Sequence, residues 1–174
     1  MAEDTFHGAI PTRVRRELLI DSADSSTLAG SCGNLAFVVT RGQGRRNTVR
    51  KRTRMLEELS AENPAGFFFL NVVPDGAAMP DEDARAISRT VNQRFAERFI
   101  AQAIVLEGSG VWLNSMRLVA RTMLLAIPSA HPRKVFESVE DAVAWFVTTA
   151  PDQDGFGGFE FLKQLADLRS HQGW

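Results

Sequence analysis

A strand–helix–strand–helix pattern between residues 100 and 146 limits the folds open to this chain more than any other feature. It begins with an apolar run at 100–106 and passes through the glycine-broken turn at 107–110 into a long helical pattern. A short strand at 134–137 and a second helix follow. Two strands joined by a crossover helix form a βαβ unit, which buries a parallel sheet beneath helices. The sequence therefore predicts an α/β fold.

The segment 67–73 is the most continuously apolar stretch of the chain and is rich in residues that favour strands. A strand without polar alternation is buried on both faces. We therefore expect 67–73 to be the central strand, flanked by strands at 35–40 and 101–106. The expected architecture is one domain with a mixed or parallel sheet of four to five strands, helices packed on it, and a C-terminal helix.

Further elements follow from local patterns. We predict strands at 16–22 and 34–40, and we interpret the serine- and glycine-rich segment between them as a surface connection that contains Cys32. Helices are predicted at 47–62, from 80 onward, from 111 onward and at 138–148. The expected buried stripe of the second of these helices is Ala84, Ile87, Val91, Phe95 and Phe99. That of the third is Trp112, Met116, Val119, Ala120, Met123 and Ile127.

The two ends of the chain differ from its middle. Residues 1–15 are polar and are expected to form a flexible arm, followed by the domain at 16–150 and by a linker and helix at 151–174. Gly155 to Gly158 should act as a hinge. The helix after it should pack back on the domain, or on a second subunit, through Phe161, Leu165 and Leu168.

Composition excludes several classes of protein. Hydrophobic residues make up 44% of the 174 residues and the net charge is −1, so no overall field favours nucleic acid or an anionic membrane. The single cysteine excludes an internal disulfide. The start of the chain lacks a signal-peptide pattern, and no apolar run is long enough to span a bilayer. We therefore expect a cytoplasmic protein with no membrane span and no nucleic-acid partner.

Basic residues crowd the start of the predicted helix 47–62, where positive charge opposes the helix dipole. Helix stability does not explain this arrangement. The basic surface is a candidate contact surface, and the alternative is a merely solvated face. Its residues are Arg45, Arg46, Arg50, Lys51 and Arg54, with Arg52 between them.

The C-terminal half resembles the STAS domain, and in particular its SpoIIAA-like branch. The residues that carry the resemblance are Ala-Ile-Val-Leu-Glu-Gly-Ser at 103–109, Arg-Leu-Val at 117–119, and Arg-Lys-Val-Phe-Glu-Ser-Val-Glu-Asp-Ala-Val-Ala-Trp-Phe at 133–146. The resemblance implies a STAS-like single domain and a regulatory role of the kind that anti-sigma-factor antagonists have. In those proteins a serine after the central strand is phosphorylated. The matching segment 72–83 has no serine or threonine, and Asp81, Glu82 and Asp83 occupy the helix start.

The patterns of catalytic and metal sites are missing from the sequence. His7, His131 and His171 lack the spacing of a metal site. The turn from Glu107 to Gly110 lacks the lysine of a phosphate-binding loop and is one residue short of a nucleophile elbow. We therefore expect no enzyme activity, no cofactor and no metal.

Two functions remain open. The first is a non-enzymatic regulatory module that binds another protein, or forms a homodimer, through the loops near 75–83 and 107–117. Its predicted contact residues are Asp75, Met79, Asp81, Glu82, Glu107, Ser109, Trp112, Asn114 and Arg117. The alternative is a small-molecule or lipid binder, whose pocket would be lined by Phe67, Phe69, Phe95, Trp112 and Met116.

Overall fold

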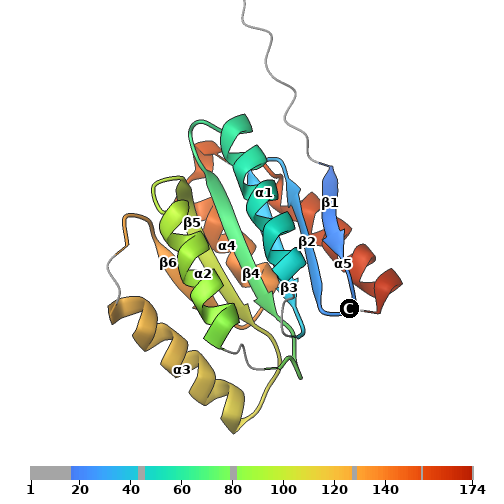
Figure 1. Cartoon of the computed structure of the whole chain (residues 1–174), viewed down its shortest axis with the longest axis vertical. Coiled ribbons are helices and arrows are strands. Elements are labelled where there is room, and N and C mark those ends of the chain that lie inside the picture. Colours follow the sequence, from blue (N-terminus) through green and yellow to red (C-terminus); the bar gives the residue numbers. More distant parts are fainter. Residues whose placement is uncertain (1–16, 43–45, 79–81, 127–128, 154, 174) are drawn as a thin grey trace, which may run out of the picture.

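The computed structural model describes residues 17–42, 46–78, 82–126, 129–153 and 155–173 (Figure 1). Within them the strands are β1 (Leu18–Ala23), β2 (Thr27–Cys32), β3 (Leu35–Thr40), β4 (Phe67–Val73), β5 (Phe99–Leu106) and β6 (Arg133–Phe136). The α-helices are α1 (Arg46–Glu62), α2 (Glu82–Arg94), α3 (Val111–Ala126), α4 (Val139–Thr149) and α5 (Gly158–Gln172), with a 3-10 turn at Pro151–Gln153. The expected α/β fold is confirmed.

The described strands form one mixed sheet in the order β1-β2-β3-β4-β5-β6. The pairs β1–β2 and β2–β3 are antiparallel, while β3, β4, β5 and β6 are parallel. The prediction that 67–73 lies between 35–40 and 101–106 is confirmed, because Leu70 pairs with Phe37 on one side and with Ala103 on the other.

Helices cover both faces of this sheet. Figure 1 shows α1 and α2 in front of the sheet and α4 and α5 behind it. Alternate residues of β4 serve the two layers: Phe68 packs in the core beneath α4 and α5, and Phe67 in the core beneath α1 and α2. Helix α3 lies beside the edge strand β6. None of the described helices is both long and apolar enough to cross a membrane.

The sheet has six described strands because β2 occupies the segment that we interpreted as a surface connection. That interpretation is wrong. Cys32 is buried at the end of β2, and its thiol lies 3.4 Å from the carbonyl oxygen of Phe156. The connection to β3 is a two-residue turn in which Gly33 has a φ of 54°, a conformation that favours glycine.

The small residues of β2 concealed the strand in the sequence, and packing explains one of them, Gly30. A Cβ at Gly30 would lie 2.2 Å from the carbonyl oxygen of Leu19 and 2.9 Å from the ring of Phe37. The aromatic ring of β3 therefore uses the space that a side chain on β2 would fill. Strand propensity alone cannot reveal such a site, because it depends on a cross-strand neighbour.

Two further expectations need correction. Phe99 is the first residue of β5 rather than part of the α2 stripe; Val91 and Phe95 are buried as predicted, while the side chains of Ala84 and Ile87 lie outside the described residues. The expected hinge at Gly155–Gly158 is also wrong, because Phe156 is fully buried in the core. A Cβ at Gly33 would lie 2.1 Å from the carbonyl oxygen of Gly155, so this segment is packed against the β2–β3 turn.

Helix α5 packs back on its own domain, as one of the two expected arrangements required. Phe161 and Leu165 are buried among residues of the sheet and α4, and Leu168 packs against them. The ring of Phe161 meets that of Phe37 edge-on at 5.6 Å. Residues 1–15, the expected flexible arm, lie outside the described residues.

Replacing Phe161 with alanine should destabilise the protein by about 3–5 kcal/mol, because a fully buried ring leaves a cavity between α5 and the sheet. Phe159 is the matched control: it lies two residues earlier on the same helix and is 83% exposed. Phe159→Ala should change stability by no more than about 0.5 kcal/mol. Urea unfolding of both variants measures the difference, and equal losses would contradict the packing of α5.

Candidate functional site

The candidate site lies at the end of the sheet that is formed by the carboxyl ends of the parallel strands. Two loops meet there, one after β4 and one after β5. The backbone N–H of Glu107 donates to the carbonyl oxygen of Val73 at 2.9 Å. Gly108 has a φ of 108°, and a Cβ there would lie 2.6 Å from the carboxyl carbon of Asp75. The positive φ favours glycine here, and the structure joins the two loops that carry the predicted contact residues.

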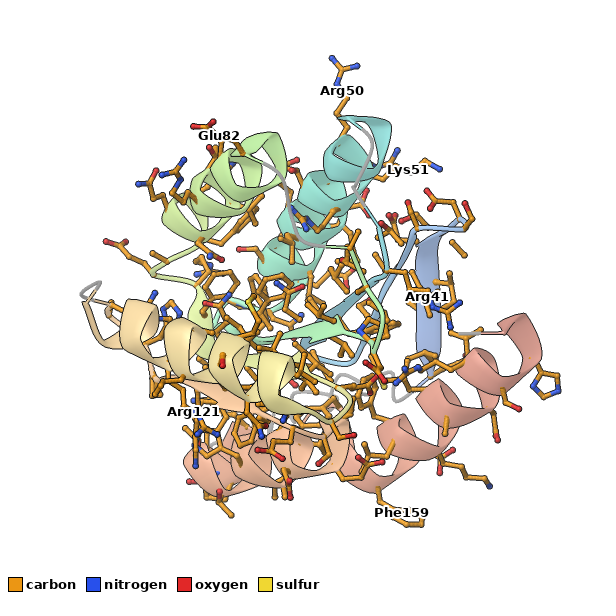
Figure 2. All side chains as sticks on the ribbon, turned by 90° about the horizontal axis from the view of Figure 1, so that it is seen from below. Arg41, Arg50, Lys51, Glu82, Arg121 and Phe159 are labelled. Carbon is orange, nitrogen blue, oxygen red and sulfur yellow. The ribbon has the colours of Figure 1, made fainter. Side chains whose placement is uncertain are left out.

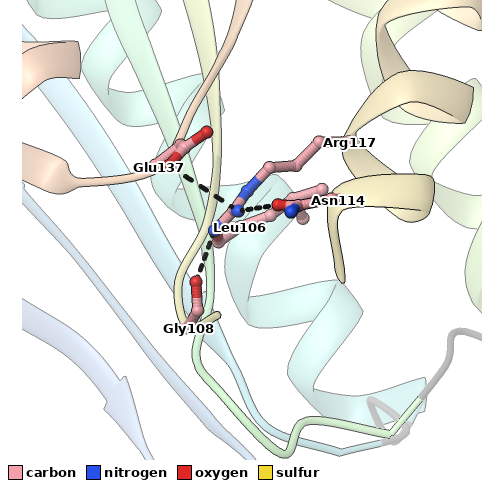
Figure 3. A network of polar contacts seen from close by, with 5 residues as sticks. All are labelled: Leu106, Gly108, Asn114, Arg117 and Glu137. Carbon is pink, nitrogen blue, oxygen red and sulfur yellow. Dashed lines mark hydrogen bonds and ion pairs between the residues drawn. The ribbon is translucent and has the colours of Figure 1, made fainter. Parts of the chain in front are cut away.

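Arg117 fixes the loop after β5 from inside (Figure 3). Its side chain is 4% exposed. Its Nε and Nη2 donate to the carbonyl oxygen of Leu106 at 3.2 and 2.6 Å, and Nη2 also donates to that of Gly108 at 2.6 Å. Its Nη1 donates to Oδ1 of Asn114 at 2.9 Å and lies 3.7 Å from Oε2 of Glu137.

The partners of Arg117 define what it does. Three of its hydrogen bonds end on backbone carbonyls, and the carboxylate of Glu137 is both more distant and 62% exposed. Buried carbonyl oxygens need donors, and a guanidinium supplies several in a fixed geometry. Arg117 therefore holds the loop and the first turns of α3 in place. In this role it positions the surface from within rather than presenting its own charge to a partner.

Glu107 is likewise engaged inside the molecule. Its two carboxylate oxygens accept from Nη1 and Nη2 of Arg169 at 2.7 and 2.6 Å, which joins the loop after β5 to α5. This hydrogen bonding, above all, raises the pKa of Arg169. Both side chains are about one-fifth exposed, at 19% and 22%. A bidentate pair of this kind restricts the loop more than a single bond would.

The other predicted contact residues divide into two groups. Asp75, Glu82, Ser109 and Asn114 are exposed, and they come from the loops after β4 and β5 and the first turns of α2 and α3. Met79 and Asp81 lie outside the described residues, as does the side chain of Trp112. A contact role for the exposed residues stays a prediction.

Of the inward stripe predicted for α3, the structure describes only the side chains of Met116 and Ala120. Met116 and Ala120 are only half-buried, whereas the buried residue between them is Arg117. The side chains of Trp112, Val119 and Met123, and all of Ile127, lie outside the described residues. Because α3 lies beside the sheet edge rather than on a face, much of its surface is not enclosed by the core.

The basic surface on α1 is partly described. Figure 2 shows Arg50 and Lys51 projecting away from the helix, and both are exposed. Arg54 is exposed and pairs with Glu58 one turn later at 2.7 Å. Arg45 and the side chain of Arg46 lie outside the described residues. These exposed charges agree with a solvated face and also leave a contact role open.

Sequence reasoning missed a groove between α3, β6 and α4, with a volume of about 500 Å³. The rings of Phe136 and Trp145 lie 5.4 Å apart within it, and the Lys134 ammonium lies 5.2 Å from the centre of the Phe136 ring. The full lining is Arg121, Lys134, Val135, Phe136, Glu137, Asp141, Ala144, Trp145 and Thr148. The sequence offered one signal, the neighbours Trp145 and Phe146, because adjacent residues of a helix point in different directions and one of them lies nearer the surface.

The structure does not support the predicted apolar pocket. The rings of Phe67 and Phe95 lie 6.2 Å apart, and each also packs near Phe99. Phe69 stacks on the same Phe99 ring at 5.4 Å. These side chains fill one another's space, so the three described phenylalanines of the proposed lining are core residues.

One histidine, His131, lies at the periphery of the hydrophobic core. His131 is 9% exposed; its Nδ1 lies 3.0 Å from the carbonyl oxygen of Ala96, and its ring packs edge-on against Phe99. Burial lowers the pKa of His131, and the nearby Arg133 adds to this, while the bond to Ala96 acts in the opposite direction. Among the described residues no cluster of histidine, cysteine or carboxylate side chains could hold a metal ion.

Comparison with known proteins adds one likeness. No protein-family model matches the chain, and no curated protein sequence matches it. A solved structure from Shewanella loihica PV-4, described as an uncharacterised protein of the DUF3478 family with a SpoIIAA-like fold, is similar to it. This is the resemblance that the sequence indicated. The two chains are 16% identical over 74% of this chain and 91% of the other, with a TM-score of 0.44. At this level the likeness says nothing about binding or activity.

Arg117→Met should lower stability by about 1–3 kcal/mol, because the carbonyl oxygens of Leu106 and Gly108 would lose their buried donor. Arg121→Met, four residues later on the same helix and exposed, is the control and should change stability by no more than about 0.5 kcal/mol. Hydrogen exchange should also become faster at residues 107–111 in the first variant alone. Unchanged exchange there would contradict the positioning role.

His131 makes stability depend on pH. Its pKa is lower in the folded protein than in the unfolded chain, so the unfolded chain binds more protons once the pH falls below about 6.5. The stability contributed by neutral His131 is therefore complete above that pH and is lost as the pH falls toward the folded pKa. Replacing His131 with asparagine should make the fall in melting temperature between pH 7 and pH 5 shallower. An unchanged fall in the His131→Asn variant would contradict this role of His131.

Proposed function

We propose that this protein is a non-enzymatic interaction module that binds another protein through α3 and the groove beside it. The groove is the observation that supports this most. It combines two aromatic rings with two basic residues, Arg121 and Lys134, and two acidic ones, Glu137 and Asp141. Tryptophan, phenylalanine and arginine are enriched where proteins bind one another, and charged rims around apolar centres are typical of such contacts.

The outer surface of α3 extends this region. Leu118 is 65% exposed, and it lies one turn before Arg121 at the groove. The loop that precedes α3 contributes the exposed Ser109, and the first turn of α3 contributes the exposed Asn114. Because Arg117 and the Glu107–Arg169 pair hold this loop from within, the surface is ordered before a partner arrives. A preorganised surface avoids part of the entropy cost of binding.

A phosphorylation switch of the usual kind would need a hydroxyl in the loop after the central strand. The segment 74–83 has none. Its acids either imitate a phosphorylated surface or only stabilise the start of α2, and neither role requires a kinase. Ser109 is exposed in the loop after β5 and Ser115 is exposed in the first turns of α3. Modification of either, with a change in binding, would move the switch to the loop after β5.

Site-specific photo-crosslinking in the native host tests the proposal. A photoreactive phenylalanine analogue at position 118 or 121 should capture one partner protein. The same group at Lys163, which is exposed on α5, should not capture it. Adding Arg121→Glu to the position-118 probe should reduce the captured fraction at least tenfold, because it reverses a charge at the groove.

The possible results separate the alternatives. Capture of a second copy of this chain at position 118, together with a dimer in light scattering, would identify the homodimer as the occupant. Equal capture at positions 118 and 163, or none at either, would contradict the proposed surface. A small molecule retained in native mass spectrometry, without a protein partner, would favour the binder instead.

A further inference from the structure

Strand β1 forms the edge of the sheet opposite to β6, and within the described residues it pairs only with β2. The backbone N–H of Leu18 donates to Oε1 of Gln164 on α5 at 2.8 Å rather than to β2. The carbonyl oxygen of Leu19 lies against β2 instead, 2.2 Å from where a Cβ of Gly30 would be. Backbone groups of successive residues alternate between the two sides of an antiparallel strand. The N–H and C=O of Ile20 therefore point outward, where another strand could pair with them.

Two apolar side chains at this edge are exposed to solvent. Leu19 is 42% exposed and Ile20 is 40% exposed. Of the four large hydrophobic side chains that are exposed in the described part of the chain, these are the two that adjoin in sequence. Adjoining apolar residues on an open strand edge are a site for pairing with another chain. The edge of β1 thus offers both backbone groups and apolar surface.

A hollow of about 180 Å³ lies between this edge and the second half of α1. Its full lining is Leu19, Ile20, Asp21, Ser31, Met55, Glu58, Leu59 and Glu62. Met55 and Leu59 are buried and supply its apolar part. Pockets for drug-sized ligands measure about 300–1,000 Å³, so this hollow suits the end of a single long side chain.

The charged groups of the hollow are all acidic: Asp21, Glu58 and Glu62. Oε1 of Glu58 accepts from Nε of Arg54 at 2.7 Å, whereas neither Asp21 nor Glu62 forms an ion pair within the described residues. Burial, above all, and the charge of Glu58 raise the pKa of Asp21, against the opposite effects of Lys51 and Arg54. Carboxylates gathered in this way attract a cation.

This acidic lining decides between the possible occupants of the edge. A second copy of the chain that paired through its own β1 would bring the same acids against each other, and like charges across a strand pair are destabilising. The bulge that interrupts β1 between Ile20 and Ser22 keeps the open stretch short. Backbone pairing alone is therefore insufficient, and side-chain contacts must select the occupant. A basic segment gains attraction where a second copy meets repulsion.

We propose that the outer edge of β1 binds an extended basic segment of another protein. The segment pairs with the backbone of Ile20 and places an arginine or lysine side chain in the hollow. The aliphatic part of that side chain packs on Leu19 and Met55, and its charged end meets Asp21 and Glu62. In strand addition of this kind, backbone hydrogen bonds give affinity and a side-chain pocket gives specificity. Because β1 and β6 are opposite edges of the sheet, this site is independent of the proposed function.

Calorimetry on the full chain with two synthetic peptides of about eight residues tests the site. One peptide alternates arginine with valine, the other glutamate with valine, and the first should bind roughly tenfold more tightly. Asp21→Asn and Glu62→Gln should each weaken its binding about fivefold, and both side chains are exposed, so folding is preserved. Glu57→Gln is the matched control: Glu57 adjoins Glu58 on α1, but it pairs with Arg94 and lies outside the hollow. Its variant should bind like the wild type.

Amide hydrogen exchange measured by NMR shows where the arginine peptide binds. The Ile20 amide should exchange roughly tenfold more slowly with the peptide than without it, because a strand bond then protects it. The Leu19 amide, which faces β2 in either case, should change little. Equal binding of the two peptides, binding that survives both acid substitutions, or an unchanged Ile20 amide would overturn the proposal. A dimer of the chain that protects the Ile20 amide without peptide would overturn it as well.

Discussion

Burial of β4 on both faces is the constraint on which the remaining structure depends. Its phenylalanines alternate between two separate cores, so neither layer of helices can be removed without exposing aromatic rings to water. Such exposure costs roughly 25 cal/mol for each Å² of apolar surface. This explains why α5, distant in sequence, belongs to the fold: Phe156 and Phe161 complete the layer that α4 alone leaves open beside β3. Strands at the edges of the sheet are not subject to this burial on both faces, so the surface available for contacts lies there.

At the carboxyl ends of the parallel strands, polar interactions rather than apolar packing hold the loops in place. Arg117 supplies donors to carbonyls that the sheet no longer pairs, and Arg169 connects Glu107 to the C-terminal helix. Buried ion pairs lose much of their attraction to desolvation, so the main effect of the Glu107–Arg169 pair is to fix the geometry of the loop. Their consequence here is a fixed loop before α3. A fixed loop is a better platform for recognition than a mobile one, because less order must be imposed on binding.

The groove beside α3 combines aromatic rings with charges of both signs, and its lining comes from three elements near the β6 edge. Such a mixed surface suits the varied surface of a protein partner.

The sequence alone determined the elements whose signals are local. Continuous apolarity marked β4 and its central place, and the serine and acids at 138–141 marked the start of α4, where Ser138 accepts from the backbone of Asp141. The tertiary structure decided the rest. Strand β2 has glycine at position 30 because the carbonyl oxygen of Leu19 and the ring of Phe37 leave no room for a Cβ, and Phe156 lies in the core where a hinge was expected. Arg117 was recognised only as a surface residue, because its buried partners are backbone carbonyls that carry no sequence signal. Local patterns report propensity and burial, whereas these features depend on neighbours brought together from distant parts of the chain.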